Sequence, residues 1–449
     1  MVTLGEKLPL VTVLPFVGIL LSIALFPLVL PRFWQKHFGK IALFWALLSI
    51  LPLLYLFPKE TLHEILHTLL AEYIPFILLI SSLYIISGNI YLHGNFSGTP
   101  IFNTIYLFIG SLLASLMGTS GASIVLIRPL LRANAWRKDT AHVFIFFIFL
   151  VSNIGGALTP LGDPPLFLGF LKGVPFFWTL NLFPTMFFCV IYLLILFFII
   201  DSLHYRREKS FLPKNKEKKP FVILGWYNIF FLIGVPLTIL ISANLPLPSL
   251  KFFGVERPLN EIIRDLFLVL LAGISYYITP KKVREKNEFT FFPIKEVAIL
   301  FFGIFMSMIP ALNILKAGEK GALKPLIISL NEPAHYFWMT GILSAFLDNA
   351  PTYLTFLSTC LGKFYPGLAE KEAILRLIQD YPKYLLAISE GAVFFGALTY
   401  IGNAPNFMVR SIVEEKGIPM PSFFGYLIKF SFPILIPMFL LLTLIFYRS

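Results

Sequence analysis

The sequence predicts an all-α polytopic membrane protein made of two inverted repeats, each with about five transmembrane helices, a re-entrant hairpin and a broken helix. Three observations carry this prediction. Hydrophobic residues make up 57% of the 449 residues and charged residues only 13%, whereas soluble domains carry about 25% charged residues. Apolar runs recur along the chain, each close to the roughly 20 residues that cross a bilayer as a helix. A polar motif with Gly and Pro interrupts two of these runs, at 156–167 and 396–407.

The first half of the sequence is predicted to contain three uninterrupted spans, two broken spans and a final span. The N-terminal run is longer than the apolar core of a signal peptide, about 7–15 residues, and has no small-residue cleavage site, so we expect a retained helix. The predicted spans are 9–30, 40–57, 72–92, 101–134 with a break at "GTSGAS", 140–172 with a break at "GGALTPLGDPP", and 175–200.

The second half repeats this order after one clearly polar segment, which holds seven Lys or Arg and three acidic residues. Five full crossings per half would invert the second copy, because an odd number of crossings reverses the side of entry. We therefore predict a first repeat at 1–200, a cytoplasmic linker at 201–221 and a second repeat at 222–449. The spans of the second half are 222–243, 265–280, 293–315, 335–361 with a break at "LDNAP", 384–410 with a break at "YIGNAPN", and 422–447.

The net charge of +12 lies mainly in connecting loops and reports topology rather than nucleic-acid binding. Lys and Arg gather in cytoplasmic loops, and the predicted topology puts four basic connections on one side, with both termini outside. We expect an integral protein of the bacterial inner membrane, with lipid and small ions as partners and no nucleic acid. The basic connections are 31–40, 132–138, 201–221 and 281–295.

No sequence motif indicates an enzyme or a cofactor. Cys189 and Cys360 fall in apolar runs and support no disulfide framework. The seven histidines are scattered, and the sequence shows no Cys/His metal cluster, phosphate-binding loop or hydrolytic triad. We expect no catalytic residues and no cofactor.

The interrupting motif reads "GALTPLGDPPLF" in the first half and "GALTYIGNAPNF" in the second, with seven of twelve positions identical and Asp163 opposite Asn403. An unsatisfied backbone group in hydrocarbon costs several kcal/mol, so a break is tolerated only inside protein or beside a wet cavity. The exposed helix ends carry partial charges that can hold an ion. Paired breaks in inverted repeats indicate a secondary transporter with a site near the midplane. A kink that serves packing alone is the alternative.

Asp348, in "SAFLDNAPTYL", is the first candidate for ion binding, because a carboxylate near mid-membrane is costly and usually functional. Asn349 adds an amide oxygen, and Pro351 frees a backbone carbonyl. Such oxygens suit a hard cation, and we expect Na⁺ at Asp348, Asn349 and Asp163. The alternative roles for Asp348 are pairing with an Arg and capping of a helix that starts at Ala350 or Pro351.

Polar residues near the breaks complete the predicted binding set. Asn403 keeps an oxygen acceptor where the first half has Asp163, and "GTSGAS" aligns with "LDNAPT", which sets Thr119 opposite Asp348. Small hydroxyl residues also serve helix packing in membranes, so that role stays open. The further candidates are Thr159, Thr399, Ser152, Asn153, Thr119, Ser120 and Ser123.

Two more charged residues lie in apolar runs. Glu390 is a candidate proton relay, or a boundary residue near Lys383. Arg128 follows the first hairpin tip by about two turns, and could pair with an Asp, bind an anion or reach the cytoplasmic edge.

At "SAFLDNAP" and "GGALTPLGDPP" the chain resembles the ion transporter superfamily, and is most similar to sodium/proton antiporters of the NhaD type, which are grouped with arsenite and citrate carriers. The resemblance implies an elevator-like carrier, often a homodimer, in which Asp163, Asp348 and Asn349 handle cations and protons. The chain departs from the pattern at Pro164 and Pro165, where those sequences continue with a Thr-rich run.

The sequence therefore predicts a Na⁺/H⁺ antiporter in which two protons or one sodium ion compete for a pocket with Asp163 and Asp348. The alternative is a citrate, dicarboxylate or arsenite-type anion carrier that uses helix N-termini and Arg128. A passive channel fits inverted repeats less well, and a membrane-embedded enzyme lacks its motifs.

Overall fold

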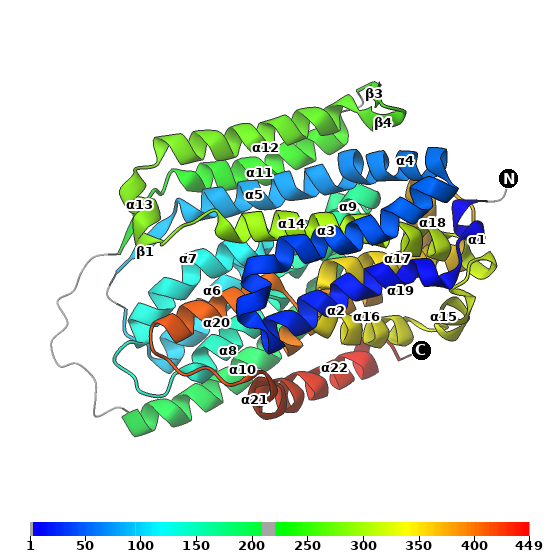
Figure 1. The fold of residues 1–449 in the computed structure, drawn as a ribbon. Coiled ribbons are helices and arrows are strands. Elements are labelled where there is room, and N and C mark those ends of the chain that lie inside the picture. The colour runs from blue at the N-terminus through cyan, green and yellow to red at the C-terminus, as the bar shows by residue number, and fades with distance from the viewer. Residues whose placement is uncertain (1–2, 95, 209–220, 246, 449) are drawn as a thin grey trace.

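The structure is a computed structural model that describes residues 3–94, 96–208, 221–245 and 247–448. It is almost entirely helical, and its long helices lie side by side along one common direction (Figure 1). Among the described residues, eight helices are long and apolar enough to cross a membrane. The prediction of an all-α polytopic membrane protein is confirmed.

Several helices of the N-terminal third begin at a proline, which suits the first turn because its missing N–H needs no partner there. The span predicted at 40–57 begins earlier, at Pro31, so the basic segment before it is helical. The elements are α1 (Leu4–Lys7), a 3₁₀ turn (Leu10–Val13), α2 (Leu14–Val29), α3 (Pro31–Leu56), α4 (Pro58–His67), a π turn (Thr68–Tyr73) and α5 (Ile74–Gly88).

Two helical hairpins have the same sharp turn. The backbone of Gly118 has φ +79° and ψ 147°, and that of Asp348 has φ +77° and ψ 139°. Glycine adopts such angles readily, whereas another residue is strained by about 1–3 kcal/mol. The first hairpin is α6 (Pro100–Met117) and α7 (Thr119–Asn134), and the second is α16 (Pro333–Leu347) and α17 (Asn349–Phe364).

These turns correct the predicted alignment of the hairpin tips by one residue. Gly118 corresponds to Asp348, and Thr119 to Asn349, since each pair occupies the same place relative to its turn. The prediction matched polar side chains, but the geometry of the turn decides the register.

The two broken helices share a local design. Each has a helix, a 3₁₀ turn, an extended residue and a second helix, in the order α8 (Ala141–Leu150), Ile154–Leu158 and α9 (Pro164–Lys172), or α19 (Pro382–Phe394), Phe395–Leu398 and α20 (Ala404–Glu415). A Cβ atom on Gly162 would lie 1.9 Å from the carbonyl oxygen of Gly156, and one on Gly402 would lie 2.7 Å from that of Gly396. The repeated glycines therefore permit a close backbone approach.

The remaining helices surround these four units. α10 continues to Glu208, so 201–208 of the predicted linker is helical, and 209–220 lies outside the described residues. The elements are a 3₁₀ turn (Phe176–Leu182), α10 (Phe183–Glu208), α11 (Asn228–Asn244), α12 (Leu259–Ile278), α13 (Lys281–Lys286), α14 (Phe292–Lys316), a 3₁₀ turn (Gly318–Lys320), α15 (Lys324–Ser329), α18 (Glu370–Asp380), α21 (Phe423–Tyr426), a π turn (Leu427–Ser431) and α22 (Phe432–Phe446). Two short antiparallel pairs join β1 (Tyr91–His93) to β2 (Val222–Leu224) and β3 (Ser249–Phe252) to β4 (Val255–Pro258).

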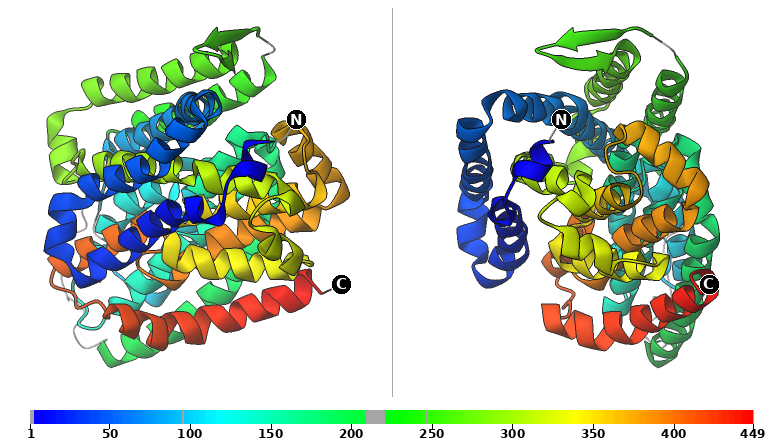
Figure 2. Two further views of the ribbon diagram at one scale, coloured as in Figure 1. Left: turned by 45° about the vertical axis from the view of Figure 1, so that its right-hand side comes forward. Right: turned by 90° about the vertical axis from the view of Figure 1, so that its right-hand side faces the viewer.

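The broken helices lie at the centre. Every residue from Val143 to Val151 in and after α8 is fully buried. α11 and α12 lie at one edge and α10 and α22 at the opposite edge (Figure 2), and these outer helices expose many large apolar side chains. A bilayer requires an apolar outer surface of any protein that spans it, and it tolerates interrupted helices only where protein surrounds them.

Candidate functional site

Asp163 is the centre of a polar cluster to which both hairpins and both broken helices contribute. Its Oδ1 accepts hydrogen bonds from the Thr119 hydroxyl at 2.9 Å and the Asn403 amide at 3.0 Å. Its Oδ2 accepts one from the Asn349 amide. The side chain is 1% exposed, so these three donors replace the water that a buried carboxylate loses.

Asp348 lies at the tip of the second hairpin, beside this cluster. Its Oδ1 accepts the backbone N–H of Ala350 at 3.1 Å, so it caps α17. Capping is the structural role that the sequence left open for this residue. The same residue also lines a cavity shared with Asp163. Its position at the hairpin tip is therefore compatible with both helix capping and the predicted ion binding.

The cavity between the two aspartates has a volume of about 50 Å³, room for a small ion with a few waters, since a water needs about 10–15 Å³ of such space. Apolar side chains of α5 and α14, among them Leu83 and Phe301, close one side. Among the described residues, the lining includes no Lys, Arg or His. The cavity therefore offers two carboxylates, two amides and hydroxyls without a cationic side chain.

Four helices begin at this cavity. Their first residues, Thr119 of α7, Pro164 of α9, Asn349 of α17 and Ala404 of α20, all line it. Helix N-termini carry partial positive charge and stabilise nearby negative charge. The four ends therefore partly compensate the two carboxylates, which would otherwise be too costly to bury together.

A chain of side-chain amides supports the cluster from behind. Asn403 donates to the carbonyl of Ser152 at 3.1 Å and to Oδ1 of Asn153 at 3.3 Å. Asn153 in turn donates to Oδ1 of Asn406 at 2.7 Å. The sequence analysis missed Asn406, although it lies inside the second copy of the motif, where the first copy has Leu166.

Five further predicted residues form no hydrogen bond with Asp163 in the described part of the chain. Ser120 lines the cavity, and Ser152 shares a 2.9 Å hydrogen bond with Ser123. Thr159 and Thr399 do not line it. Their hydroxyls donate to backbone carbonyls of Ser115 and Ala345 in the hairpins, so these two threonines connect the broken helices to the hairpins.

Comparison with known proteins identifies the family. The model of the family described as "Putative citrate transport" matches residues 5–447. The chain belongs to this family. Relatives from Mycobacterium bovis and Mycobacterium tuberculosis, both named as uncharacterized transporters, are each 25% identical over 333 residues, which cover 72% of this chain and 72% of each relative. The protein is therefore an integral membrane transporter.

Glu390 of this transporter lies apart from the cavity, among α19, α10 and the C-terminus. Its carboxylate accepts hydrogen bonds from Thr185 at 2.8 Å and from Tyr447 at 2.6 Å, and the side chain is 1% exposed. Both partners lie at helix ends, Thr185 in the first turn of α10 and Tyr447 directly after α22, so the position near the membrane boundary stays a prediction. The relay role also stays a prediction.

Arg128, which the sequence left with three roles, donates to Oε2 of Glu288 at 3.1 Å. Glu288 also lies 3.3 Å from Nζ of Lys416. The hydrogen bond from Arg128 holds the pKa of Glu288 below its usual range. Glu288 lies in the connection before α14, so it links that connection to α7 and to the end of α20.

Proposed function

We propose that this transporter exchanges Na⁺ for protons at the cavity between Asp163 and Asp348. One observation carries the proposal: two carboxylates share a small cavity whose described lining holds no cationic side chain. Such a site is neutralised either by protons or by a metal cation, and the competition between them is the basis of antiport. A cavity of about 50 Å³ suits Na⁺ better than a large organic anion.

The orientation of the side-chain amides distinguishes the Na⁺-free state of the cavity from the Na⁺-bound state. Asn349 and Asn403 both donate to Asp163 in this structure, which suits a carboxylate without a bound metal ion. A side-chain amide carries an oxygen as well as two N–H donors. If each amide turns over, its oxygen faces the cavity and joins the carboxylates as a ligand of Na⁺, the oxygen-rich set that a hard cation prefers.

The arrangement also supports alternating access. The polar side of the cavity comes from the hairpins and broken helices, whereas α5 and α14 form its apolar side. We propose that the hairpins and broken helices move as one body past α5 and α14, as in an elevator, and that the two halves at 1–200 and 222–449 are inverted repeats. The same proposal places the protein in a bacterial inner membrane, as a homodimer, with both termini outside.

The decisive experiment measures proton flux in proteoliposomes that contain the purified protein and an internal pH indicator. Na⁺, Li⁺, K⁺ and citrate are added in turn to the outside. Antiport predicts rapid proton movement on adding Na⁺, and none in liposomes that carry Asp163→Asn protein. Proton movement that follows citrate alone would reject the antiport proposal.

Citrate transport is the second candidate, favoured by the family to which the chain belongs and by the four helix N-termini at the cavity. These ends could hold substrate carboxylates, but two aspartates would repel them unless cations enter too. This candidate therefore predicts uptake of labelled citrate that requires a co-bound cation, and it needs the apolar side of the cavity to open further.

A further inference from the structure

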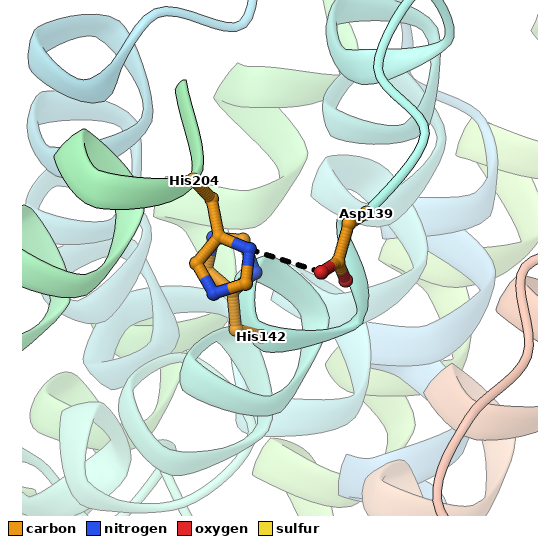
Figure 3. A group of neighbouring side chains, drawn as sticks. All are labelled: Asp139, His142 and His204. Atoms are coloured by element: carbon orange, nitrogen blue, oxygen red, sulfur yellow. Dashed lines mark ion pairs between the residues drawn. The ribbon is translucent and has the colours of Figure 1, made fainter. Parts of the chain in front are cut away.

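A second group of polar residues lies far from the cavity, where the loop before α8 meets the last turns of α10. Asp139, His142 and His204 each offer a ligand atom, and these atoms lie within 4.8 Å of one another. Figure 3 shows the two imidazole rings against each other with the Asp139 carboxylate beside them. Nδ1 of His204 is 3.0 Å from Oδ2 of Asp139. No metal cluster was predicted here, because the three residues come together only through folding.

The hydrogen bonds of Asp201 decide which nitrogen of His142 is free. Asp201 accepts from Asn103 at 3.0 Å and pairs with Arg137 at 2.6 Å. It is therefore an ionised acceptor, and the nitrogen 2.8 Å from it, Nε2 of His142, must carry the proton. The other nitrogen, Nδ1, then presents a lone pair.

That lone pair is buried without a partner. His142 is 3% exposed, and its Nδ1 has no hydrogen-bond partner among the described residues. A buried polar atom without a partner is rare and asks for an explanation. An imidazole whose far nitrogen donates to a carboxylate is the arrangement that orients histidine ligands on metal ions.

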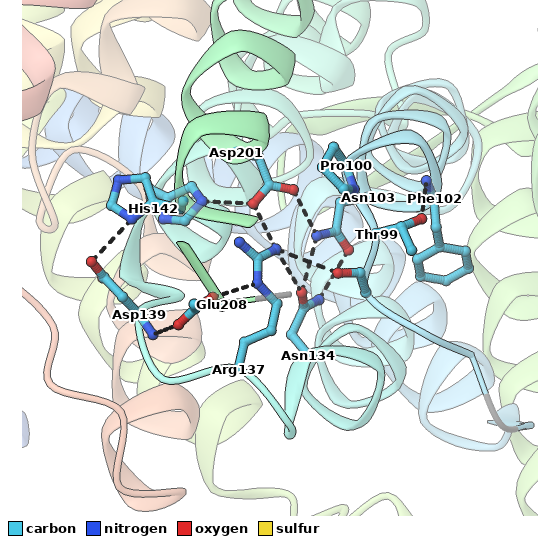
Figure 4. Close-up of polar contacts among 12 residues, drawn as sticks. Thr99, Pro100, Phe102, Asn103, Asn134, Arg137, Asp139, His142, Asp201 and Glu208 are labelled. Atoms are coloured by element: carbon cyan, nitrogen blue, oxygen red, sulfur yellow. Dashed lines mark hydrogen bonds and ion pairs between the residues drawn. The ribbon is translucent and has the colours of Figure 1, made fainter. Parts of the chain in front are cut away.

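The surrounding charges favour a cation. Figure 4 shows the carboxylates of Asp201 and Glu208 beside the guanidinium of Arg137. The carboxylate of Asp139 pairs with His204 instead. Glu208 accepts the backbone N–H of Asp139 at 2.7 Å, which holds the loop that carries the first ligand. His142 and its supports are fixed, whereas His204 and Asp139 are 29% and 64% exposed and are free to turn inward.

We propose that Asp139, His142 and His204 bind one divalent transition-metal ion, with Zn²⁺ as the best fit. Two imidazoles and one carboxylate are a common zinc ligand set, with water in the remaining position. The ion joins the loop before α8 to the end of α10, on the side that the charge pattern predicts to be cytoplasmic. Since α8 leads into the break that carries Asp163, bound zinc stiffens one support of the transport site.

The test is a zinc titration of the purified full-length protein in detergent after chelator treatment. We expect one saturable site per chain and, with Co²⁺ in place of Zn²⁺, a visible absorption band of tetrahedral coordination. His204→Ala and Asp139→Asn should each weaken the affinity by about tenfold or more. Both positions are exposed enough to change without loss of the fold, whereas His142 also holds Asp201.

The matched control is His335→Ala, since His335 is exposed and distant in sequence from the group. It should bind zinc as the wild type does. His63→Ala removes one of two neighbouring histidines of α4, His63 and His67, and it should also leave the zinc affinity unchanged. Absence of a saturable site in the wild type, or equal affinity in the wild type and His204→Ala, would overturn the proposal, whatever the transport assay shows.

Discussion

Asn349, the first residue of α17, donates its side-chain amide to Asp163, the residue before α9. The hydrogen bond joins the hairpin of the second half to the broken helix of the first. Thr119 of the first hairpin and Asn403 of the second broken helix donate hydrogen bonds to the same carboxylate. One acid is thus the meeting point of four segments, and neither half holds a complete site alone.

Asp348→Asn should separate packing from chemistry. Asparagine caps helices about as well as aspartate, so we expect normal insertion and folding. The variant loses a carboxylate of the cavity, so sodium-driven proton movement in proteoliposomes should disappear. Normal antiport by a correctly inserted Asp348→Asn protein would reject the mechanism and leave the anion carrier as the better interpretation.

Asn349→Ala should weaken sodium binding while preserving the fold. It removes the amide oxygen that the proposed mechanism turns toward Na⁺. A loss of about 1.4 kcal/mol or more of binding free energy corresponds to a rise of about tenfold or more in the half-saturating Na⁺ concentration. Thr399→Val is the control, because that hydroxyl binds the Ala345 carbonyl outside the cavity. The control should lower thermal stability with little change in the sodium dependence; a larger change in the control would reverse the assigned roles.

Glu288→Gln should remove a pH-dependent contribution to the stability of the folded protein. Arg128 lowers the pKa of Glu288 from its usual 4.5, so the carboxylate contributes fully above pH 4.5 and less as the pH falls through the lower folded value. Wild type should therefore melt above the variant at pH 7, and the difference should shrink under acidic conditions. Melting curves in detergent at several pH values measure it. A difference that grows on acidification contradicts the assignment.

A single-cysteine scan tests the predicted topology. A cysteine at position 210 should resist a membrane-impermeant thiol reagent in intact cells, because the basic segment 201–221 is predicted to be cytoplasmic. Lys251→Cys, in the exposed hairpin of β3 and β4, should react readily. The native Cys189 and Cys360 are buried and give little background. The opposite labelling pattern would invert the whole topology.

The sequence predicted the elements whose signals are local. Breaks at Gly162 and Gly402, and a hairpin tip near Asp348, follow from Gly, Pro and polar residues inside apolar runs, and the structure has breaks at these places. The tip alignment failed by one residue because the signal is a backbone turn, and a glycine in one hairpin corresponds to an aspartate in the other.

The missed features depend on contacts between distant residues. Asp201 belongs to a segment whose charge predicted a linker, yet it is buried against Arg137 and His142 within α10. The proposed zinc ligands Asp139 and His204 likewise lie close together, although α8, α9 and most of α10 separate them in sequence. Local composition does not predict such pairings, because they arise only when helices pack.

The backbone of Asp348 has a consequence for protein engineering. Since its φ is +77°, replacement by glycine would relieve strain of about 1–3 kcal/mol. Replacing the capping residue by glycine costs only about a few tenths of a kcal/mol. Asp348→Gly should therefore raise the melting temperature while it deletes an acid of the cavity. Any screen that ranks variants of this transporter by heat tolerance alone would enrich glycine at this position and select a robust protein that lacks one of the two acids of the proposed ion site.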